Sequence, residues 1–207
     1  MPKIIKPSKG TFTSANITVD SAGRIVSASS GTAGDSNIFP SYIAQTGTYT
    51  AQPGTNKIYV YAVGGGGGGG GQFGSGRGNG GIGGSGLAVI PVSAPYTAAI
   101  VVGNPGSGTT GTGQSGSAGT ASTLDTNTVV ANGGNGGSGR GSTPGNTGSF
   151  SVASPATSLF DYSPIGSASC DLIFGGSSNT ASRGGPGQGP GSSGGSGAVV
   201  IYEPLGS

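Results

Sequence analysis

The chain has 207 residues, of which 49 are glycine, 7% are charged and none is histidine. This glycine share far exceeds the usual value of about 7%, and a net charge of +2 with 13 Phe and Tyr is unlike the charge-rich, aromatic-poor composition of most disordered proteins. The single Cys170 excludes an intrachain disulfide, and the weak charge argues against nucleic acid and anionic membranes as partners. No run of about 18 apolar residues predicts a membrane span, and no apolar segment follows MPKIIKPSKG, so we expect no signal peptide.

Residues 1–37 form the first predicted unit. Within ANITVDSAGRIVSASSG, Ile17 and Val19 alternate with polar residues, Ser21 to Gly23 favour a turn, and a second strand begins at Ile25. Two strands alone are only marginally stable in water. We therefore expect this segment to pair with other copies of itself or with a partner.

Residues 38–207 form the second unit, which begins with strands. TGTYTAQPGTNKIYVYAV predicts a turn at Pro53-Gly54 and a strand from Lys57 to Val63 that is apolar on both faces and is therefore expected to be covered on both. LAVIPVSAPYTAAIVVG predicts two strands that turn near residues 93–96. Pro91 places the first of these at a sheet edge or a bulge.

The remaining strands are short and separated by polar, glycine-rich blocks. TLDTNTVVA predicts one short strand, AVVIYEP predicts the final strand, and residues 142–183 are the least glycine-dense part of the unit. No segment has helical periodicity or a helix start signal. The predicted fold class is all-β without α-helix, in which short strands form a base and glycine-rich structure lies between them.

The glycine blocks repeat with a period of three. Polyproline II geometry has three residues per turn and no internal hydrogen bonds, so each block would carry side chains on one edge and present two bare edges to neighbouring backbones, which must supply the hydrogen-bond partners. We therefore predict a bundle of polyglycine/polyproline II helices. The residues spaced by three are Asn79, Ile82 and Ser85, then Asn132, Asn135 and Ser138, then Ser193 and Ser196.

The longest glycine run directly follows the strand predicted at residues 57–63. A helix enclosed on every side must lack side chains on all three edges, and this run, which would span about 25 Å, meets that requirement. Collagen is excluded because it needs glycine at every third position without interruption, and a flexible linker is disfavoured because strands bracket the run. We predict that the run forms the bundle core. Its members are Gly64, Gly65, Gly66, Gly67, Gly68, Gly69, Gly70 and Gly71.

Four stretches, in chain order, resemble the glycine-rich domain of bacteriophage tail fibre and tail-tip adhesin proteins. They are TGTYTAQPGTNKIYVYAVGGGGGGGG, SGLAVIPVSAPYTAAIVVGNPGSG, NTVVANGGNGGSG and GGSGAVVIYEP. The resemblance implies a β-structured base and a glycine-helix bundle whose connecting loops contact the host. ITVDSAGRIVSASSG is also similar to a segment of phage fibre proteins, which are commonly trimers, and this implies that residues 1–37 attach or trimerise the chain. The region 142–183 departs from the pattern and is expected to form distal loops.

Aromatic residues are the candidates for receptor contact, because aromatic faces suit sugar rings and exposed receptor loops. Four lie in the region 142–183, and Phe73 directly follows the glycine run, where it would lie at a bundle tip. The alternative is a satellite hydrophobic core beneath a long loop, which applies most to Phe150 and Phe174. The four candidates in the region are Phe150, Phe160, Tyr162 and Phe174.

The residues present argue against an enzyme. Without histidine there is no Ser-His-Asp or Cys-His site, and for Asp161 and Asp171 we expect two solvated loop carboxylates rather than a catalytic pair. Gly106-x-Gly108-x-x-Gly111 matches a dinucleotide fingerprint by chance at this glycine content, because no helix follows, and no lysine completes a Walker loop. We predict no catalytic residue, no metal and no cofactor.

Three arginines lie among glycines. Arg77 and Arg140 occur in GSGRG and Arg183 in SRGG. RNA-binding segments of the Arg-Gly type carry dense arginine and bind through charge, so three arginines on this chain are too few. We expect them to cap carbonyl groups at the bundle ends or to face solvent.

The function predicted from these observations is that of a phage virion protein, a tail fibre or tail-tip adhesin that is assembled in the host cytoplasm and binds the bacterial surface. The expected partners are other tail proteins, a glycan or outer-membrane protein receptor, and further copies in a homotrimer, with no nucleic acid and no membrane insertion. The alternatives are a purely structural tail or capsid-decoration component, an ice-binding glycine bundle, which is disfavoured because similar chains rely on disulfides, and a flexible surface-coat protein.

Overall fold

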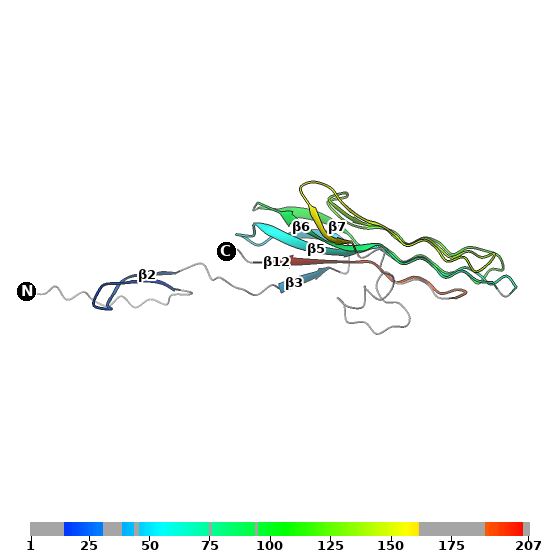
Figure 1. Cartoon of the computed structure of the whole chain (residues 1–207), viewed down its shortest axis with the longest axis horizontal. Helices are drawn as coiled ribbons and strands as arrows, with labels where there is room; N and C mark the ends of the chain where they lie inside the picture. Colours follow the sequence, from blue (N-terminus) through cyan, green and yellow to red (C-terminus); the bar gives the residue numbers. More distant parts are fainter. Residues whose placement is uncertain are drawn as a thin grey trace, which may run out of the picture.

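We describe the protein in a computed structural model, for residues 15–30, 39–43, 46–74, 76–93, 95–161 and 189–204. These residues contain no helix and form three antiparallel sheets, which confirms the predicted all-β class. In Figure 1 the strands of the two larger sheets gather at one end of the domain, here called the base. Long glycine-rich segments run from the base to the opposite end, here called the distal tip (Figure 1).

The amino-terminal strands form the smallest sheet. β1 (Ala15–Val19) pairs with β2 (Ile25–Ser30), with Ile17 opposite Ala28, and this hairpin pairs with no other described strand. In the turn between them the backbone N–H groups of Ala22 and Arg24 donate to Oδ1 of Asp20 at 2.9 Å. The predicted strand, turn and second strand are confirmed.

The base consists of two five-stranded sheets, ordered β11-β6-β5-β12-β3 and β10-β9-β8-β7-β4. In the first sheet β12 lies between β5 and β3, and in the second the consecutive strands β7 to β10 are joined by β4, so segments far apart in sequence lie side by side. The strands are β3 (Phe39–Ile43), β4 (Gly47–Thr50), β5 (Lys57–Val63), β6 (Ser85–Pro91), β7 (Thr97–Val101), β8 (Ser122–Leu124), β9 (Val129–Ala131), β10 (Phe150–Val152), β11 (Thr157–Asp161) and β12 (Ala198–Glu203).

The main core contains side chains from the facing surfaces of these two sheets. β5 contributes Ile58, Val60 and Ala62 to it, and its other face contributes Tyr61 and Val63 to a second buried cluster. Because successive side chains of a strand point to opposite faces, a strand that is apolar throughout serves both clusters. Burial on both faces of the strand 57–63 is therefore confirmed, apart from the half-buried Tyr59.

The prediction of a single strand at TLDTNTVVA was wrong. The stretch forms two strands, β8 and β9, which pair with each other across residues 125–128. Asp125 and Thr126 turn the chain with φ values of 47° and 58°, a left-handed conformation that Asp tolerates better than most residues. The carboxylate of Asp125 also accepts hydrogen bonds from the Ala99 N–H at 3.1 Å and the Tyr96 hydroxyl at 3.3 Å.

Pro91 does not mark an edge strand, because β6 lies inside its sheet between β11 and β5. The proline is the last residue of β6, and the pairing with β11 has already ended at Val89. Because Pro91 has no N–H group, it could not donate to β11, but no pairing with β11 remains at this position. A central strand can therefore accommodate proline at its end.

The glycine-rich part of the chain forms a bundle of extended segments around the run Gly64–Gly71, here called the central run. All eight N–H groups of the central run donate to backbone carbonyls at 2.8–2.9 Å. Every third residue donates to the same neighbouring segment: Gly64, Gly67 and Gly70 to segment 78–84, and Gly65, Gly68 and Gly71 to segment 114–120. Gly66 and Gly69 donate to Gly195 and Ser192 of the final segment, 191–197.

Two further segments donate to the central run from other sides. Gly134 and Gly137 of segment 132–138 donate to the carbonyls of Gly65 and Gly68, and Gly106 and Thr109 of segment 103–109 donate to those of Gly66 and Gly69. Five described segments therefore surround the run. The hydrogen bonds have the three-residue period that a polyproline II helix would produce, and the helical conformation itself stays a prediction.

The close packing of the run depends on the absence of Cβ atoms. A Cβ built on six of its glycines would come closer than 3.0 Å to a backbone atom of another segment, a distance that real Cβ atoms essentially never show. The region 142–161 joins this architecture as well, because residues 143–149 hydrogen-bond along segments 78–84 and 132–138 before β10 begins. The six glycines are Gly64, Gly65, Gly67, Gly68, Gly70 and Gly71.

Candidate functional site

The distal tip consists of loops 72–77, 110–114 and 139–142 together with residues 189–191. The first loop closes through reciprocal backbone hydrogen bonds, Phe73 N to Gly76 O at 3.0 Å and Gly76 N to Phe73 O at 3.1 Å, with Gly74 at a φ of 62°. Nε2 of Gln72 also donates to the Gly74 carbonyl at 3.0 Å. The loop holds itself together through its backbone, and the Phe73 side chain stays 55% exposed.

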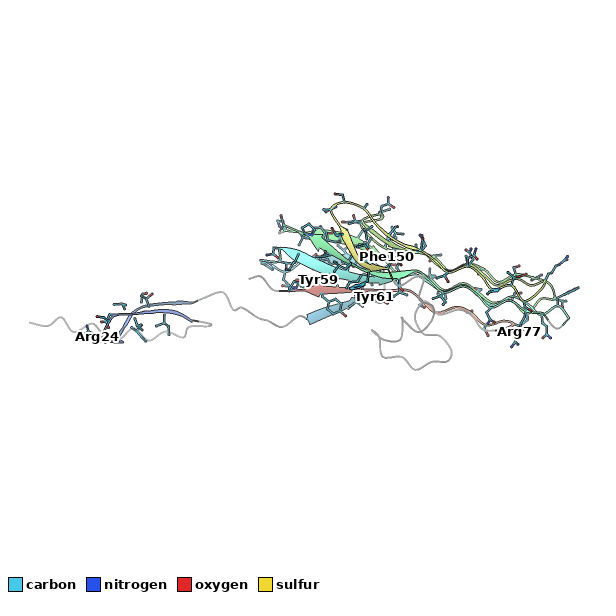
Figure 2. All side chains as sticks on the ribbon, viewed as in Figure 1. Arg24, Tyr59, Tyr61, Arg77 and Phe150 are labelled. Carbon is cyan, nitrogen blue, oxygen red and sulfur yellow. The ribbon has the colours of Figure 1, made fainter. Side chains whose placement is uncertain are left out.

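Two arginines lie at the distal tip together with this phenylalanine. A Cβ built on Gly76 would lie 3.0 Å from Cα of Gly141, so loops 72–77 and 139–142 are in contact at the residues next to Arg77 and Arg140. A Cβ built on Gly113 would lie 3.4 Å from Nε of Arg140 and 3.7 Å from Cδ2 of Phe73, so both side chains lie close to this glycine. The Arg77 guanidinium lies beside Gly189, where a built Cβ would be 3.5 Å from Nη1. Figure 2 shows Arg77 at the far end of the bundle.

Both arginine side chains are exposed. Within the part of the chain that the structure describes, neither guanidinium takes part in an ion pair or a side-chain hydrogen bond. Of the two expectations for these residues, solvent exposure is therefore found and carbonyl capping is not. Arg183 lies outside the described residues.

The other sequence-predicted aromatic residues do not share one site. Phe150 is 8% exposed and packs in the main core of the base (Figure 2), whereas Phe160, on edge strand β11, is 60% exposed beside Leu159 at 41%. Phe150 is therefore buried, as its alternative interpretation expected, but in the main core of the base and not in a satellite core beneath a loop. Tyr162 and Phe174 lie outside the described residues.

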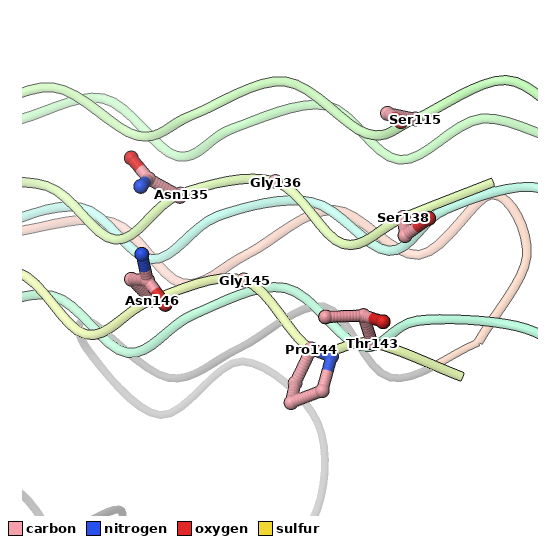
Figure 3. A pocket seen from close by; sticks show the side chains of 8 residues that line it. All are labelled: Ser115, Asn135, Gly136, Ser138, Thr143, Pro144, Gly145 and Asn146. Atoms are coloured by element: carbon pink, nitrogen blue, oxygen red, sulfur yellow. The ribbon is translucent and has the colours of Figure 1, made fainter. Parts of the chain in front are cut away.

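An open depression of about 280 Å³ lies on the side of the bundle. Figure 3 shows the amide groups of Asn135 and Asn146 on neighbouring segments at its rim. Its lining holds no charged or aromatic side chain, so it can offer hydrogen bonds to a neutral ligand but no ionic contact. The lining residues are Ser115, Asn135, Gly136, Ser138, Thr143, Pro144, Gly145 and Asn146.

A buried polar cluster in the base was not predicted from the sequence. The carboxylate of Glu203, which is 7% exposed, accepts hydrogen bonds from the Tyr49 hydroxyl at 2.5 Å, the Gln52 N–H at 3.0 Å and the Thr55 hydroxyl at 3.1 Å. Burial, together with the bond to Glu203, raises the pKa of Tyr49. The cluster joins the last strand to β4 and its following turn. Its only sequence signal is one acidic residue in the otherwise apolar AVVIYEP.

Neither a metal centre nor a membrane-spanning helix is found where the structure describes the chain. No three His, Cys, Asp or Glu side chains come together there, and no helix there is long and apolar enough to cross a bilayer. The possible pairing of Asp161 with Asp171 stays a prediction, because Asp171 lies outside the described residues.

Comparison with known proteins gives one result for the central and carboxyl-terminal parts of the chain. No curated protein matches the chain. The family model described as a glycine-rich domain matches residues 41–203, which include the whole glycine bundle and all of the base except the first two residues of β3. The chain therefore belongs to the glycine-rich domain family.

Proposed function

We propose that the chain is a bacteriophage virion protein, a tail fibre or tail-tip adhesin, that binds the surface of the bacterial host through its distal tip. The order of strands and glycine blocks, which resembles that of phage tail proteins, supports the class of protein. The position of exposed Phe73 supports the tip as the contact surface, because an aromatic side chain that is 55% exposed suits a receptor contact.

The observation that carries the proposal is the separation of the tip from the base by a bundle around the central run. All eight N–H groups of the central run are paired, so the loops at the tip project from a backbone-locked scaffold. Binding residues in proteins are disproportionately found on loops that a rigid scaffold positions. Apart from the loops, the bundle presents mainly short neutral side chains, such as those around Asn135 and Asn146.

The hairpin of β1 and β2 supplies the proposed attachment surface. Ile17, Val19 and Ile25 share one face and are 54%, 56% and 64% exposed. A two-stranded sheet with an uncovered apolar face is marginal alone, and exposed apolar patches mark interaction sites. We propose that this face packs against further copies of the chain in a trimer, or against another tail protein.

Competition for phage adsorption tests the proposed function. Purified full-length protein, added in excess to host cells, should block adsorption of the phage that carries it. A Phe73→Ser variant should block less well, whereas a Phe160→Ser variant should behave as wild type. Normal adsorption in the presence of saturating wild-type protein would contradict the proposal.

A purely structural role in the tail is the second candidate. The observation in its favour is the exposed pair Leu159 and Phe160 on edge strand β11, since an exposed apolar edge suits contact with a neighbouring protein. Under this alternative, Phe73→Ser phage would adsorb normally, and replacing Phe160 and Tyr162 by serine would leave host range unchanged while weakening tail assembly.

A further inference from the structure

The tip has a charge distribution of its own. The described part of the chain contains four basic side chains: Arg24 pairs with Asp20 at 2.8 Å, Lys57 lies on β5 in the base, and Arg77 and Arg140 lie at the tip. The described carboxylates lie elsewhere, in the amino-terminal hairpin, the β8–β9 turn and the ends of β11 and β12. The tip therefore presents two guanidinium groups with no described carboxylate beside them.

This arrangement is not required by the fold. The hydrogen bonds that close loop 72–77 are made by backbone atoms and Gln72, and the N–H of Arg140 donates to the hydroxyl of Ser138 at 3.2 Å, which needs no guanidinium. Both arginine side chains are exposed at loops that touch. Two cations of the distal tip that contribute no described internal bond are therefore available to a ligand.

We propose that Arg77 and Arg140 bind an anionic group, a phosphate or a carboxylate, of a polymer on the bacterial surface, with Phe73 against the apolar part of the same ligand. This inference rests on the proposed function and names the ligand chemistry of its site. A guanidinium presents a planar set of donors that fits two oxygens of a carboxylate or phosphate. Phe73, which lies close to Gly113 as Arg140 does, offers an aromatic ring face against which a sugar ring can pack.

Two guanidinium groups suit a small, local anionic group better than a long polyanion backbone. Proteins that bind nucleic acid through charge neutralise many phosphates along the strand, whereas the depression on the side of the bundle is lined by neutral side chains. Recognition is therefore confined to the tip, where charge and aromatic surface coincide.

Direct binding to defined polymers tests this inference. Full-length protein is immobilised, and binding of phosphate-substituted dextran, polygalacturonate and unsubstituted dextran is measured by biolayer interferometry. The phosphate and carboxylate polymers distinguish the two sources of the anionic group, and the neutral dextran reports contacts that need no charge. We expect binding of at least one anionic polymer, no binding of neutral dextran, and weakening in 1 M salt, where the Debye length falls to about 3 Å.

Charge-neutral variants locate the site. Each of Arg77→Gln and Arg140→Gln should weaken binding by about fivefold, the upper range for an exposed ion pair, and the double variant by about 25-fold if the two contributions add. Lys57→Gln removes the same charge from the base and should bind as wild type. Equal binding by the double variant, an equal loss in Lys57→Gln, or equal binding of neutral dextran would overturn the inference.

The same proteins separate this inference from the proposed function. If wild-type protein blocks phage adsorption and binds neither anionic polymer, the proposed function stands and the inference fails. If the polymers bind through the two arginines while adsorption is normal in saturating protein, the anion site stands and the role in host binding fails.

Discussion

Replacing Gly67 by alanine tests whether the central run is enclosed by other backbone segments. A Cβ built on Gly67 would come closer than 3.0 Å to the carbonyl oxygens of Asn135 and Gly134, a distance that real Cβ atoms essentially never show. Both are backbone atoms, so no side-chain rotation relieves the contact. Segment 132–138 must move away from the central run.

This movement disturbs three hydrogen bonds of segment 132–138: Gly134 N to Gly65 O, Gly137 N to Gly68 O, and Gly81 N to Asn135 O. At a net value of about 1 kcal/mol for each bond, their loss costs about 3 kcal/mol. The lower entropy of the unfolded alanine variant offsets about 0.5–1 kcal/mol of this cost. We expect the free energy of unfolding to fall by about 2 kcal/mol and Tm by about 4–8 °C.

Circular dichroism during urea and thermal unfolding measures the effect. Gly47→Ala is the matched control, because Gly47 is exposed on β4 and a Cβ there would meet no atom within 4 Å. The control should change the free energy of unfolding by less than about 1 kcal/mol, and Gly67→Val should be more damaging than Gly67→Ala. Equal stability of the two alanine variants would refute the enclosure of the run and would favour a tether.

Four further outcomes follow from the base and the hairpin. Phe150→Ala should lower the free energy of unfolding by about 3 kcal/mol, because it leaves a core cavity, whereas Phe160→Ala should cost much less in the same urea titration; equal losses would contradict the assigned burial. Glu203→Ala should lower the free energy of unfolding by about 3 kcal/mol, since three donors lose their acceptor. Glu203→Gln should lower it less, as measured by thermal unfolding, and a larger loss in the glutamine variant would disprove this assignment. Burial and the nearby Asp125 carboxylate raise the pKa of Tyr96 from 10.0 to about 12, so the contribution of Tyr96 to stability is present below pH 10 and is lost as the pH rises towards 12. Tyr96→Phe should flatten the plot of unfolding free energy against pH between these values. An unchanged slope in the variant would contradict this role of Tyr96. Removal of residues 1–37 should reduce the oligomer measured by light scattering, and an unchanged mass would exclude the hairpin as the assembly surface.

Local patterns were sufficient where the residue types themselves restrict the chain. The strand 57–63 was predicted with the bounds that the structure shows, because five of its seven residues are Ile, Val or Tyr, which favour strands, and the glycines that follow cannot continue an apolar sheet face. The turn at Ser21–Gly23 was likewise readable from its residues. In both places neighbouring residues in sequence carry the whole signal.

Predictions failed where pairing between distant segments decides the outcome. The turn at Asp125 and Thr126 lacks the glycine that usually marks a hairpin, and its conformation is accompanied by bonds from Tyr96 and Ala99. Pro91 was assigned to an edge or a bulge from its missing donor, although the neighbouring strand simply ends before it. These features depend on partners that no local pattern names.

The sequence by itself determined the all-β class, the alternation of strands with glycine blocks, and a period of three, because each follows from side-chain type and spacing along the chain. Only the tertiary structure decided which segments border the central run, that Phe150 is buried while Phe160 is exposed, and that the loops carrying Arg77 and Arg140 touch at the distal tip. The physical reason is that all the glycine blocks present nearly the same edges without side chains, so their sequences do not specify which blocks lie next to each other. Their neighbours are selected by the strands that lead into them and by hydrogen bonds between residues far apart in the chain.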